Sequence, residues 1–201
     1  MKTKSLTAYC KLTFVFILLG FVSKAQIITT VVGTNDAGYL GDSLQGVVSE
    51  VNLPEGGMAM DAAGNVYFCD YQNNRVRKLD AATGTLVNVA GNGVNGFGGD
   101  GGPAKQAKLK GPMAVALDKA GNIYIADYGN RRIRKVSAAT GNISTIAGTG
   151  NYGPYNGDGI AATLANLFET TGIAVDTAGN VYFSHLGDMR VWKIDKTSNF
   201  I

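Results

Sequence analysis

The chain has 201 residues, of which 45% are hydrophobic and 16% charged, and this balance is typical of a folded globular protein. It excludes an intrinsically disordered chain, which would be poor in apolar residues and rich in net charge. Glycine is the outlier, with 28 residues, about twice the usual share of roughly 7%. Because the glycines follow no three-residue period, a collagen-like chain is excluded and many turns are predicted.

Residues 1–25 are predicted to be a secretory signal peptide. Lys2 and Lys4 form a basic start. The apolar run Leu12–Val22 is too short to span a bilayer, and Ser23–Ala25 supplies small residues for a cleavage site. The alternative, an uncleaved membrane anchor, would need about 20 apolar residues. We therefore expect a secreted, periplasmic or cell-surface protein with no transmembrane segment after cleavage.

Removal of this segment changes the charge and the cysteine content. The formal net charge is +3, but the first 25 residues hold four of the 18 basic residues and none of the 15 acidic ones. Residues 26–201 are therefore nearly neutral, which gives no electrostatic reason to expect nucleic acid or an anionic membrane as a partner. Cys69 becomes the only cysteine, so no intrachain disulfide is expected.

Residues 26–201 contain three copies of one repeat. The motif D-x-x-G-N-[VI]-Y begins at Asp61, Asp118 and Asp176, at spacings of 57 and 58 residues. Each copy follows a glycine-rich connector in which an aromatic residue precedes an aspartate by three positions. The three pairs are Tyr39 and Asp42, Phe97 and Asp100, and Tyr155 and Asp158. A phosphate loop or metal loop would usually occur once, so three copies in register favour a connection that every structural unit needs.

The second copy gives the clearest predicted elements in chain order. Val115–Asp118 is apolar throughout and predicts a strand buried on both faces. Three more strands are predicted at Asn122–Asp127, Arg132–Val136 and Asn142–Gly148, and tight turns join the first strand to the second and the third to the fourth. Four antiparallel strands per unit predict an all-β fold, a β-propeller with about three four-stranded antiparallel blades present. A parallel β-helix is the alternative, although its coils are much shorter than this repeat.

The stretch "DKAGNIYIADYGNRRIRKV" (118–136) and the connector that begins "IAGTG" (146–150) resemble NHL-repeat proteins. The resemblance is to the long-repeat type found in exported bacterial proteins and in the teneurin NHL region, and it covers residues 28–201. It implies a propeller, commonly of six blades. The name-giving Asn-His-Leu is absent, and the third copy diverges most. It has His185 where the others have Asp70 and Asp127, and Trp192 where they have Arg77 and Arg134.

Three blades are too few to close a ring, since propellers need at least about four. Residues 28–33 align with the fourth strand of a blade, and Ile201 stands where the fourth strand of the third unit should run. We therefore expect an N-terminal fragment of a longer chain, in which residues 28–33 would complete the last blade. The alternative is that two half-rings associate, because exposed strand edges and apolar faces favour association.

Strand direction places the connectors and the loops between second and third strands on one face of the propeller. Binding residues favour such loops on a rigid scaffold. The repeated aromatic residues could stack on sugar or peptide, or could fill gaps between blades, and repetition favours the second role. The tyrosines that follow Asp70 and Asp127 could be exposed ligand contacts. The candidate ligand-binding residues of this long-loop face are Tyr39, Phe97, Tyr155, Tyr71, Tyr128 and Arg131.

The acidic and basic residues of the repeat are predicted to be structural. Each connector supplies one carboxylate and not the cluster that calcium prefers, so Asp42, Asp100 and Asp158 are expected to cap the turns that follow them. The repeated arginines are expected to form ion pairs with Asp70 and Asp127 at the rim of each blade. Cys69 is expected to be a small buried residue. The paired arginines are Arg75, Arg77, Arg132 and Arg134.

Catalysis has little support in the sequence. His185 is the only histidine, whereas a zinc site usually needs three protein ligands and a Ser-His-Asp triad needs a histidine as base. We expect no catalytic residue, metal or cofactor, and a non-catalytic binding scaffold for protein or glycan that is secreted or exposed on the cell surface. The alternatives are a propeller hydrolase or lyase with catalytic residues beyond Ile201, and a structural spacer module.

Overall fold

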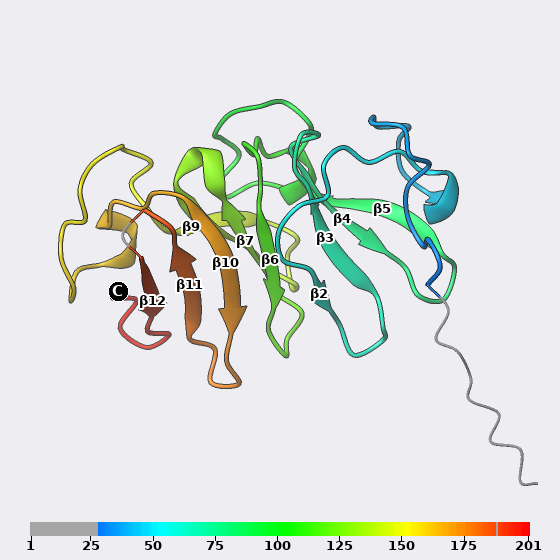
Figure 1. Ribbon diagram of the computed structural model, residues 1–201. Helices are drawn as coiled ribbons and strands as arrows, with labels where there is room; N and C mark the ends of the chain where they lie inside the picture. Colours follow the sequence, from blue (N-terminus) through cyan, green and yellow to red (C-terminus); the bar gives the residue numbers. More distant parts are fainter. Residues whose placement is uncertain (1–27, 188) are drawn as a thin grey trace, which may run out of the picture.

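The computed structural model describes residues 28–187 and 189–201. Three antiparallel sheets stand side by side as neighbouring blades (Figure 1). The predicted signal peptide lies outside the described residues. Within the described ranges, no helix has both the length and the apolar character that a membrane span requires.

The strands follow the predicted order in every repeat. The first sheet has the order β1-β5-β4-β3-β2, with β1 (Leu44–Gln45), β2 (Ala59–Met60), β3 (Val66–Asp70), β4 (Arg75–Leu79) and β5 (Thr85–Ala90). The second has β6 (Ala114–Leu117), β7 (Ile123–Asp127), β8 (Arg132–Val136) and β9 (Ile143–Ala147). The third has β10 (Thr170–Val175), β11 (Val181–His185) and β12 (Arg190–Ile194). The all-β prediction and the four-stranded antiparallel blade are confirmed.

The D-x-x-G-N-[VI]-Y motif builds the turn between the first two strands of each blade. In the second blade, Asp118 Oδ1 accepts hydrogen bonds from the backbone N–H groups of Ala120 and Asn122, and Oδ2 accepts one from the Tyr124 hydroxyl at 3.0 Å. Gly121 has φ +81°, a left-handed conformation that glycine adopts without strain. The Asn122 Oδ1 also accepts the backbone N–H of Ala138 at 2.9 Å, which ties this turn to the one between β8 and β9.

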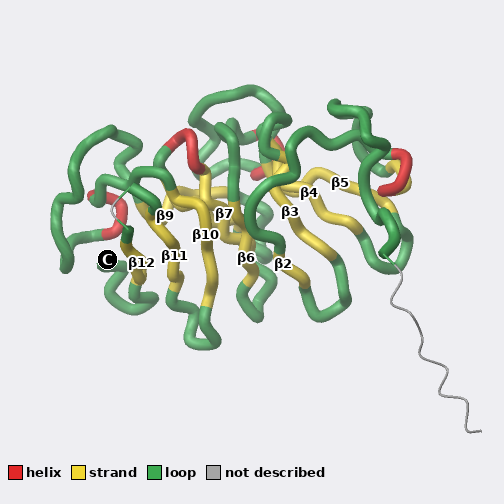
Figure 2. Tube along the Cα trace, in the orientation of Figure 1, coloured by secondary structure: helices red, strands yellow, loops and turns green. Residues whose placement is uncertain are grey.

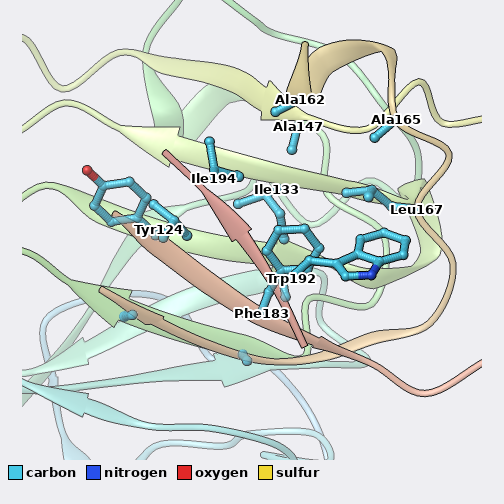
Figure 3. Close-up of a cluster of buried hydrophobic side chains, with 13 residues drawn as sticks. Tyr124, Ile133, Ala147, Ala162, Ala165, Leu167, Phe183, Trp192 and Ile194 are labelled. Carbon is cyan, nitrogen blue, oxygen red and sulfur yellow. The ribbon is translucent and has the colours of Figure 1, made fainter. Parts of the chain in front are cut away.

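Alternate residues of each blade face opposite neighbours. In β7, Ile123 and Ile125 pack with Cys69 of the first blade, whereas Tyr124 packs with Phe183 of the third. Figure 3 shows the second of these clusters between the facing sheets. The predicted burial of the first strand on both faces is confirmed for β6 of the second blade, whereas Met60 in β2 is exposed. The burial of Cys69 is confirmed, because it has no exposed surface. The core of this fold therefore lies between blades and not within a single sheet.

Each connector covers the outer edge of the blade that follows it. The first contributes β1, which pairs with β5. In the second connector, Gly101 N–H donates to the Ile143 carbonyl at 2.8 Å, and in the third Gly159 N–H donates to the Ile201 carbonyl at 2.9 Å. The connectors are otherwise loop with one short 3-10 helix each, at Gly46–Val48 (η1), Ala104–Gln106 (η2) and Ala162–Leu164 (η4) (Figure 2).

Residues 28–33 form no strand in the described part of the chain, and the expectation that they complete the last blade of a longer propeller stays a prediction. A strand requires a hydrogen-bonding neighbour along its length, and none of the three described sheets pairs with this segment. Gly33 N–H instead donates to the Gly46 carbonyl at 3.0 Å, which fastens the end of the segment to its own connector.

The turn aspartates predict a loss of stability in acid. Hydrogen bonding from the Asn180 side chain lowers the pKa of Asp176 to about 2, below its ordinary value of 3.8. Because the folded state holds the carboxylate in its charged form, this stabilisation is complete above about pH 4 and is lost as the pH falls toward 2. We expect the free energy of unfolding, measured by urea denaturation across this range, to fall less steeply in Asp176→Asn. Equal slopes in the two proteins would contradict this prediction.

Candidate functional site

The long-loop face lies where the sequence predicted it. The connectors and the loops between second and third strands lie at one end of the blades, at the top of Figure 1, and the tight β2–β3, β6–β7 and β10–β11 hairpins lie at the opposite end. One of the long-face loops contains a 3-10 helix, η3 (Tyr128–Asn130). This face is built on buried polar contacts that fix the connectors in place.

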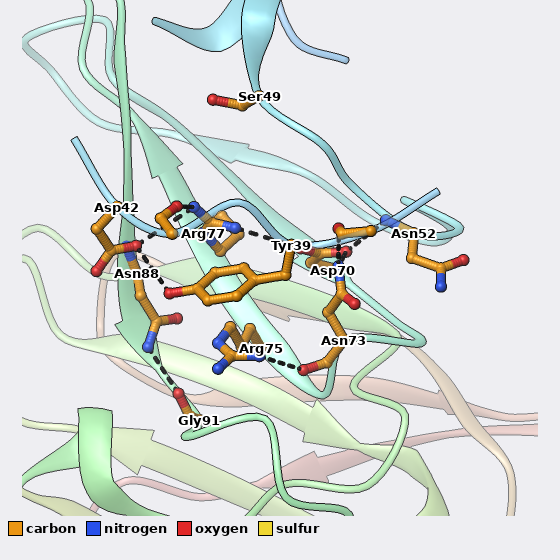
Figure 4. Close-up of polar contacts among 12 residues, drawn as sticks. Tyr39, Asp42, Ser49, Asn52, Asp70, Asn73, Arg75, Arg77, Asn88 and Gly91 are labelled. Atoms are coloured by element: carbon orange, nitrogen blue, oxygen red, sulfur yellow. Dashed lines mark hydrogen bonds and ion pairs between the residues drawn. The ribbon is translucent and has the colours of Figure 1, made fainter. Parts of the chain in front are cut away.

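A buried arginine joins each of the first two connectors to its blade. Arg77 lies 3.4 Å from Asp70 and 3.3 Å from Asp42, and its side chain has no exposed surface (Figure 4). In the second blade, Arg134 lies 3.1 Å from Asp127 and 2.6 Å from Asp100. Both arginines therefore bridge the end of the second strand to the connector.

Two expectations about these residues are corrected. Arg77 and Arg134 pair with the predicted aspartates, but inside the blade and not at its rim. Asp100 does not cap the turn that follows it, because its Oδ1 accepts from Arg134 and its Oδ2 from the Thr145 hydroxyl at 2.7 Å. Asp42 similarly accepts the Asn88 backbone N–H at 2.8 Å. A buried guanidinium requires acceptors, and this requirement outweighs the local turn preference of aspartate.

The remaining two arginines bind carbonyl groups. Arg132 donates to the carbonyls of Asn130 and Thr149, and Arg75 donates to those of Asn73 and Asn92. They make no ion pair with an aspartate among the described residues, contrary to expectation. Each fastens the loop of its own blade to the start of the next connector.

Burial dominates the electrostatics of the aspartate at the end of the second strand. It raises the pKa of Asp127, while hydrogen bonds from the Asn130 side chain, the Lys110 backbone N–H and Arg134 favour the carboxylate. The same first cause, burial, raises the pKa of Asp70 and of the Cys69 thiol. Carboxylates in such surroundings require their arginine, because an unpaired buried charge is strongly destabilising.

The repeated aromatic residues cover these arginines. The Phe97 ring centre lies 3.8 Å from the guanidinium carbon of Arg132 and 5.0 Å from that of Arg134. Tyr39 covers Arg75 and Arg77 in the same way. These cation–π contacts within one blade are a role that the sequence did not predict, and stacking of a ligand on the exposed side of these rings stays a prediction.

The third blade holds the same backbone position with a stack of aromatic rings. His185 Nε2 accepts the Phe168 backbone N–H at 2.6 Å, the bond that Asp127 forms with Lys110. The imidazole stacks on Trp192 with ring centres 4.5 Å apart and an interplanar angle of 20°. The Tyr155 ring lies 4.7 Å from Trp192 and 4.9 Å from the guanidinium of Arg190. His185 and Trp192, two residues in which the third repeat departs from the others, therefore contact each other and replace the aspartate and the arginine together.

Two predicted site residues, Tyr71 and Tyr128, line a cleft between the first and second blades. It has a volume of about 240 Å³ and its lining includes Lys110, Asn95 and Gln72. The backbone brings these groups together at Gly111 (φ +52°), where a Cβ would lie 2.8 Å from the Tyr71 ring. Sequence reasoning missed Lys110 and Asn95, because nothing in their type or spacing distinguishes them from solvated surface residues.

Arg131 lies elsewhere on the same face, at the junction of the second and third blades. Its backbone is left-handed, with φ +54°. Its guanidinium carbon lies 5.4 Å from the Tyr152 ring centre and 5.8 Å from that of Phe168. The six predicted site residues therefore fall into three separate settings. In residues 28–187 and 189–201 there is no group of three or more His, Cys, Asp or Glu side chains placed to hold a metal ion.

The buried pair predicts a test of compensation between repeats. Arg134→Met leaves Asp127 buried and unpaired and should cost about 3–5 kcal/mol of unfolding free energy. The double variant Asp127→His with Arg134→Trp carries the residues of the third repeat. It should be more stable than Arg134→Met and recover a large part of that loss. Both variants can be measured by urea denaturation at pH 7. A double variant that is no more stable than Arg134→Met would show that the ring stack does not replace the ion pair.

No family model matches the chain. It is 28% identical over 135 residues to SUPPRESSOR OF QUENCHING 1 from Arabidopsis thaliana, over 64% of this chain and 12% of that protein. It is 54% identical over 41 residues to human teneurin-1, over 20% of this chain and 2% of that protein. With human NHL repeat-containing protein 2 the identity is 27% over 124 residues, 59% of this chain and 17% of that protein. The chain thus spans less than a fifth of the length of these relatives.

Solved structures share the blade architecture. A protein of unknown function from Bacteroides thetaiotaomicron matches with a TM-score of 0.56 and 21% identity, over 65% of this chain and 32% of that one. An auxiliary nutrient binding protein from Bacteroides ovatus matches with a TM-score of 0.55 and 21% identity, over 73% and 37%. These likenesses concern the fold. With the blade topology, they show a partial β-propeller, and its repeat motif is similar in sequence to teneurins and to NHL repeat-containing proteins.

Proposed function

We propose that this protein is a secreted or cell-surface scaffold that binds a glycan on its long-loop face without catalysing a reaction. The cleft between the first and second blades carries the proposal. Tyr71 and Tyr128 supply two aromatic rings, and Lys110, Gln72 and Asn95 supply hydrogen-bonding groups around them. A sugar presents both an apolar C–H face and a rim of hydroxyls, and this combination suits such a lining. The secreted location rests on the sequence of residues 1–25.

The hydrogen bonding of the cleft supports a binding role. Within the described part of the chain, the Lys110 ammonium and the side-chain amides of Gln72 and Asn95 have no protein partner among the hydrogen bonds, and neither tyrosine hydroxyl has one. Deeper polar groups on the same face, by contrast, are committed to structural contacts: Asn130 bonds to Asp127 and to the Gly96 carbonyl. The cleft is therefore where this face offers unused donors and acceptors.

The electrostatics of the cleft favour an uncharged or weakly anionic ligand. Burial raises the pKa of Tyr128, and nearby Glu169 adds to this effect, so this phenol remains a neutral donor at pH 7. Lys110 provides one positive charge on a stem that lies against Gly129. A binding role also has a precedent in the fold, because the Bacteroides ovatus neighbour is described as a nutrient binding protein.

The prediction concerns the two tyrosines. Tyr71→Ala and Tyr128→Ala should each weaken binding about tenfold, the effect of losing ~1.4 kcal/mol of contact at a central aromatic residue. The measurement is affinity electrophoresis of the full protein in gels that contain galactan, xylan, pectin or alginate. Phe97→Ala is the matched control, because it removes an aromatic side chain of the same face that lies outside the cleft.

The possible outcomes separate the candidate functions. Weaker retention with both tyrosine variants and unchanged retention with Phe97→Ala supports a glycan site in the cleft. Release of reducing ends from any of the polysaccharides would contradict the non-catalytic role. Retention in none of the gels would contradict a glycan ligand and would favour a protein ligand or a spacer role.

A further inference from the structure

The third repeat replaces polar residues with aromatic ones where its connector meets its blade. Tyr152 occupies the repeat position of Asn95, Phe168 that of Lys110, and His185 that of Asp127. The first two repeats fold without an aromatic side chain at any of these positions, so the repeat architecture does not require one. Trp192 and His185 already replace the buried ion pair, which leaves Tyr152 and Phe168 without a structural explanation.

The two unexplained rings form the walls of a notch. Tyr152 and Phe168 meet edge to face, with ring centres 4.9 Å apart and an interplanar angle of 89°. With Pro154, His185 and adjacent glycine backbone they line a cavity of about 330 Å³. Tyr152 is 74% exposed. A large aromatic side chain this exposed buries little area against the protein, so its contribution to folding is small.

Arg131 supplies the charge of this notch. It comes from the second blade, and its guanidinium stands over both aromatic rings. Within the described residues, the Arg131 guanidinium donates one hydrogen bond, a long one of 3.5 Å to the Gly150 carbonyl, and it forms no ion pair. Arg77 and Arg134, in contrast, each bind two carboxylates. A guanidinium has five N–H donors in a planar fork, so Arg131 keeps the donors that bind a carboxylate in bidentate geometry.

We propose that this notch binds a hexuronate unit of an acidic polysaccharide, a ligand class that rests on the glycan-binding role proposed above. The C–H face of the pyranose ring packs against Tyr152 and Phe168, and the C5 carboxylate faces Arg131. Because the two rings are perpendicular, a puckered pyranose contacts both of them, whereas a flat nucleobase stacks on only one. The notch therefore adds selectivity for acidic sugars to a face whose first cleft has mixed polar chemistry.

The test uses residues that the other repeats already contain at the same positions. Tyr152→Asn installs the residue of the second repeat, and Arg131→Asn installs that of the first, where Asn74 has the same left-handed backbone, φ +51°. Both variants should therefore fold, which thermal unfolding verifies. Val94→Asn is the matched control, because it installs the residue of the third repeat at a position that is 51% exposed and lines neither the cleft nor the notch.

The probes for calorimetry on the full protein are tetragalacturonate, tetramannuronate, the methyl ester of tetragalacturonate, and AMP. We expect the wild type to bind at least one acidic tetramer about tenfold more tightly than the ester. Tyr152→Asn should weaken the acid and the ester alike, about tenfold. Arg131→Asn should remove the preference for the acid and leave the ester unchanged, and Val94→Asn should change neither.

Three results would overturn the proposal. The first is that neither acidic tetramer binds, and the second is that Tyr152→Asn and Arg131→Asn both keep the wild-type affinity for the acid. The third is that AMP binds as tightly as the tetramers. If polysaccharide retention through Tyr71 and Tyr128 persists in any of these cases, the hexuronate notch is wrong while the binding scaffold stands. If retention by the gels is also absent, both are wrong.

Discussion

The long-loop face depends on one interaction, the buried ion pair between a strand and the connector above it. Arg134 has no exposed surface, and its two carboxylate partners come from segments far apart in the chain, Asp127 at the end of β7 and Asp100 in the connector. Because a buried guanidinium is tolerated only with acceptors in place, the connector has a single position in which the blade is stable. The ring of Phe97 then covers the guanidinium of Arg134.

In the third blade, a different side chain accepts the same backbone hydrogen bond. His185 accepts the backbone N–H that Asp127 accepts in the second blade, and the stack on Trp192 fills the volume of the guanidinium. Repetition in this protein therefore separates two kinds of residue. Those shared by all copies hold the blade together, and those that differ without a packing reason, such as Tyr152, indicate a ligand.

Much of the fold could be predicted from the sequence because the repeat motif satisfies its own turn. The bonds of Asp118 reach only two to six residues along the chain, so a short pattern specifies them. Asp100 was misassigned because its arginine is 34 residues away, and sequence separation gives no sign of which partner a carboxylate will choose. Tyr71 and Tyr128 were placed on the correct face, whereas Lys110 was missed. Phe168 could have been found from the aligned repeats, where an aromatic side chain replaces that lysine.

The way each connector covers the next blade has a consequence for how such a chain divides into modules. Gly91 ends the first blade, and the segment after it protects the outer strand of the second, with Gly101 bound to Ile143. Residues 91–147, a connector with the blade that follows it, therefore form the unit in which the outer strand of the blade has its hydrogen-bonding partner. A duplication or exchange that began at Gly91 would carry its own edge protection into a new propeller, whereas one that began at β6 would arrive with a bare strand prone to aggregate.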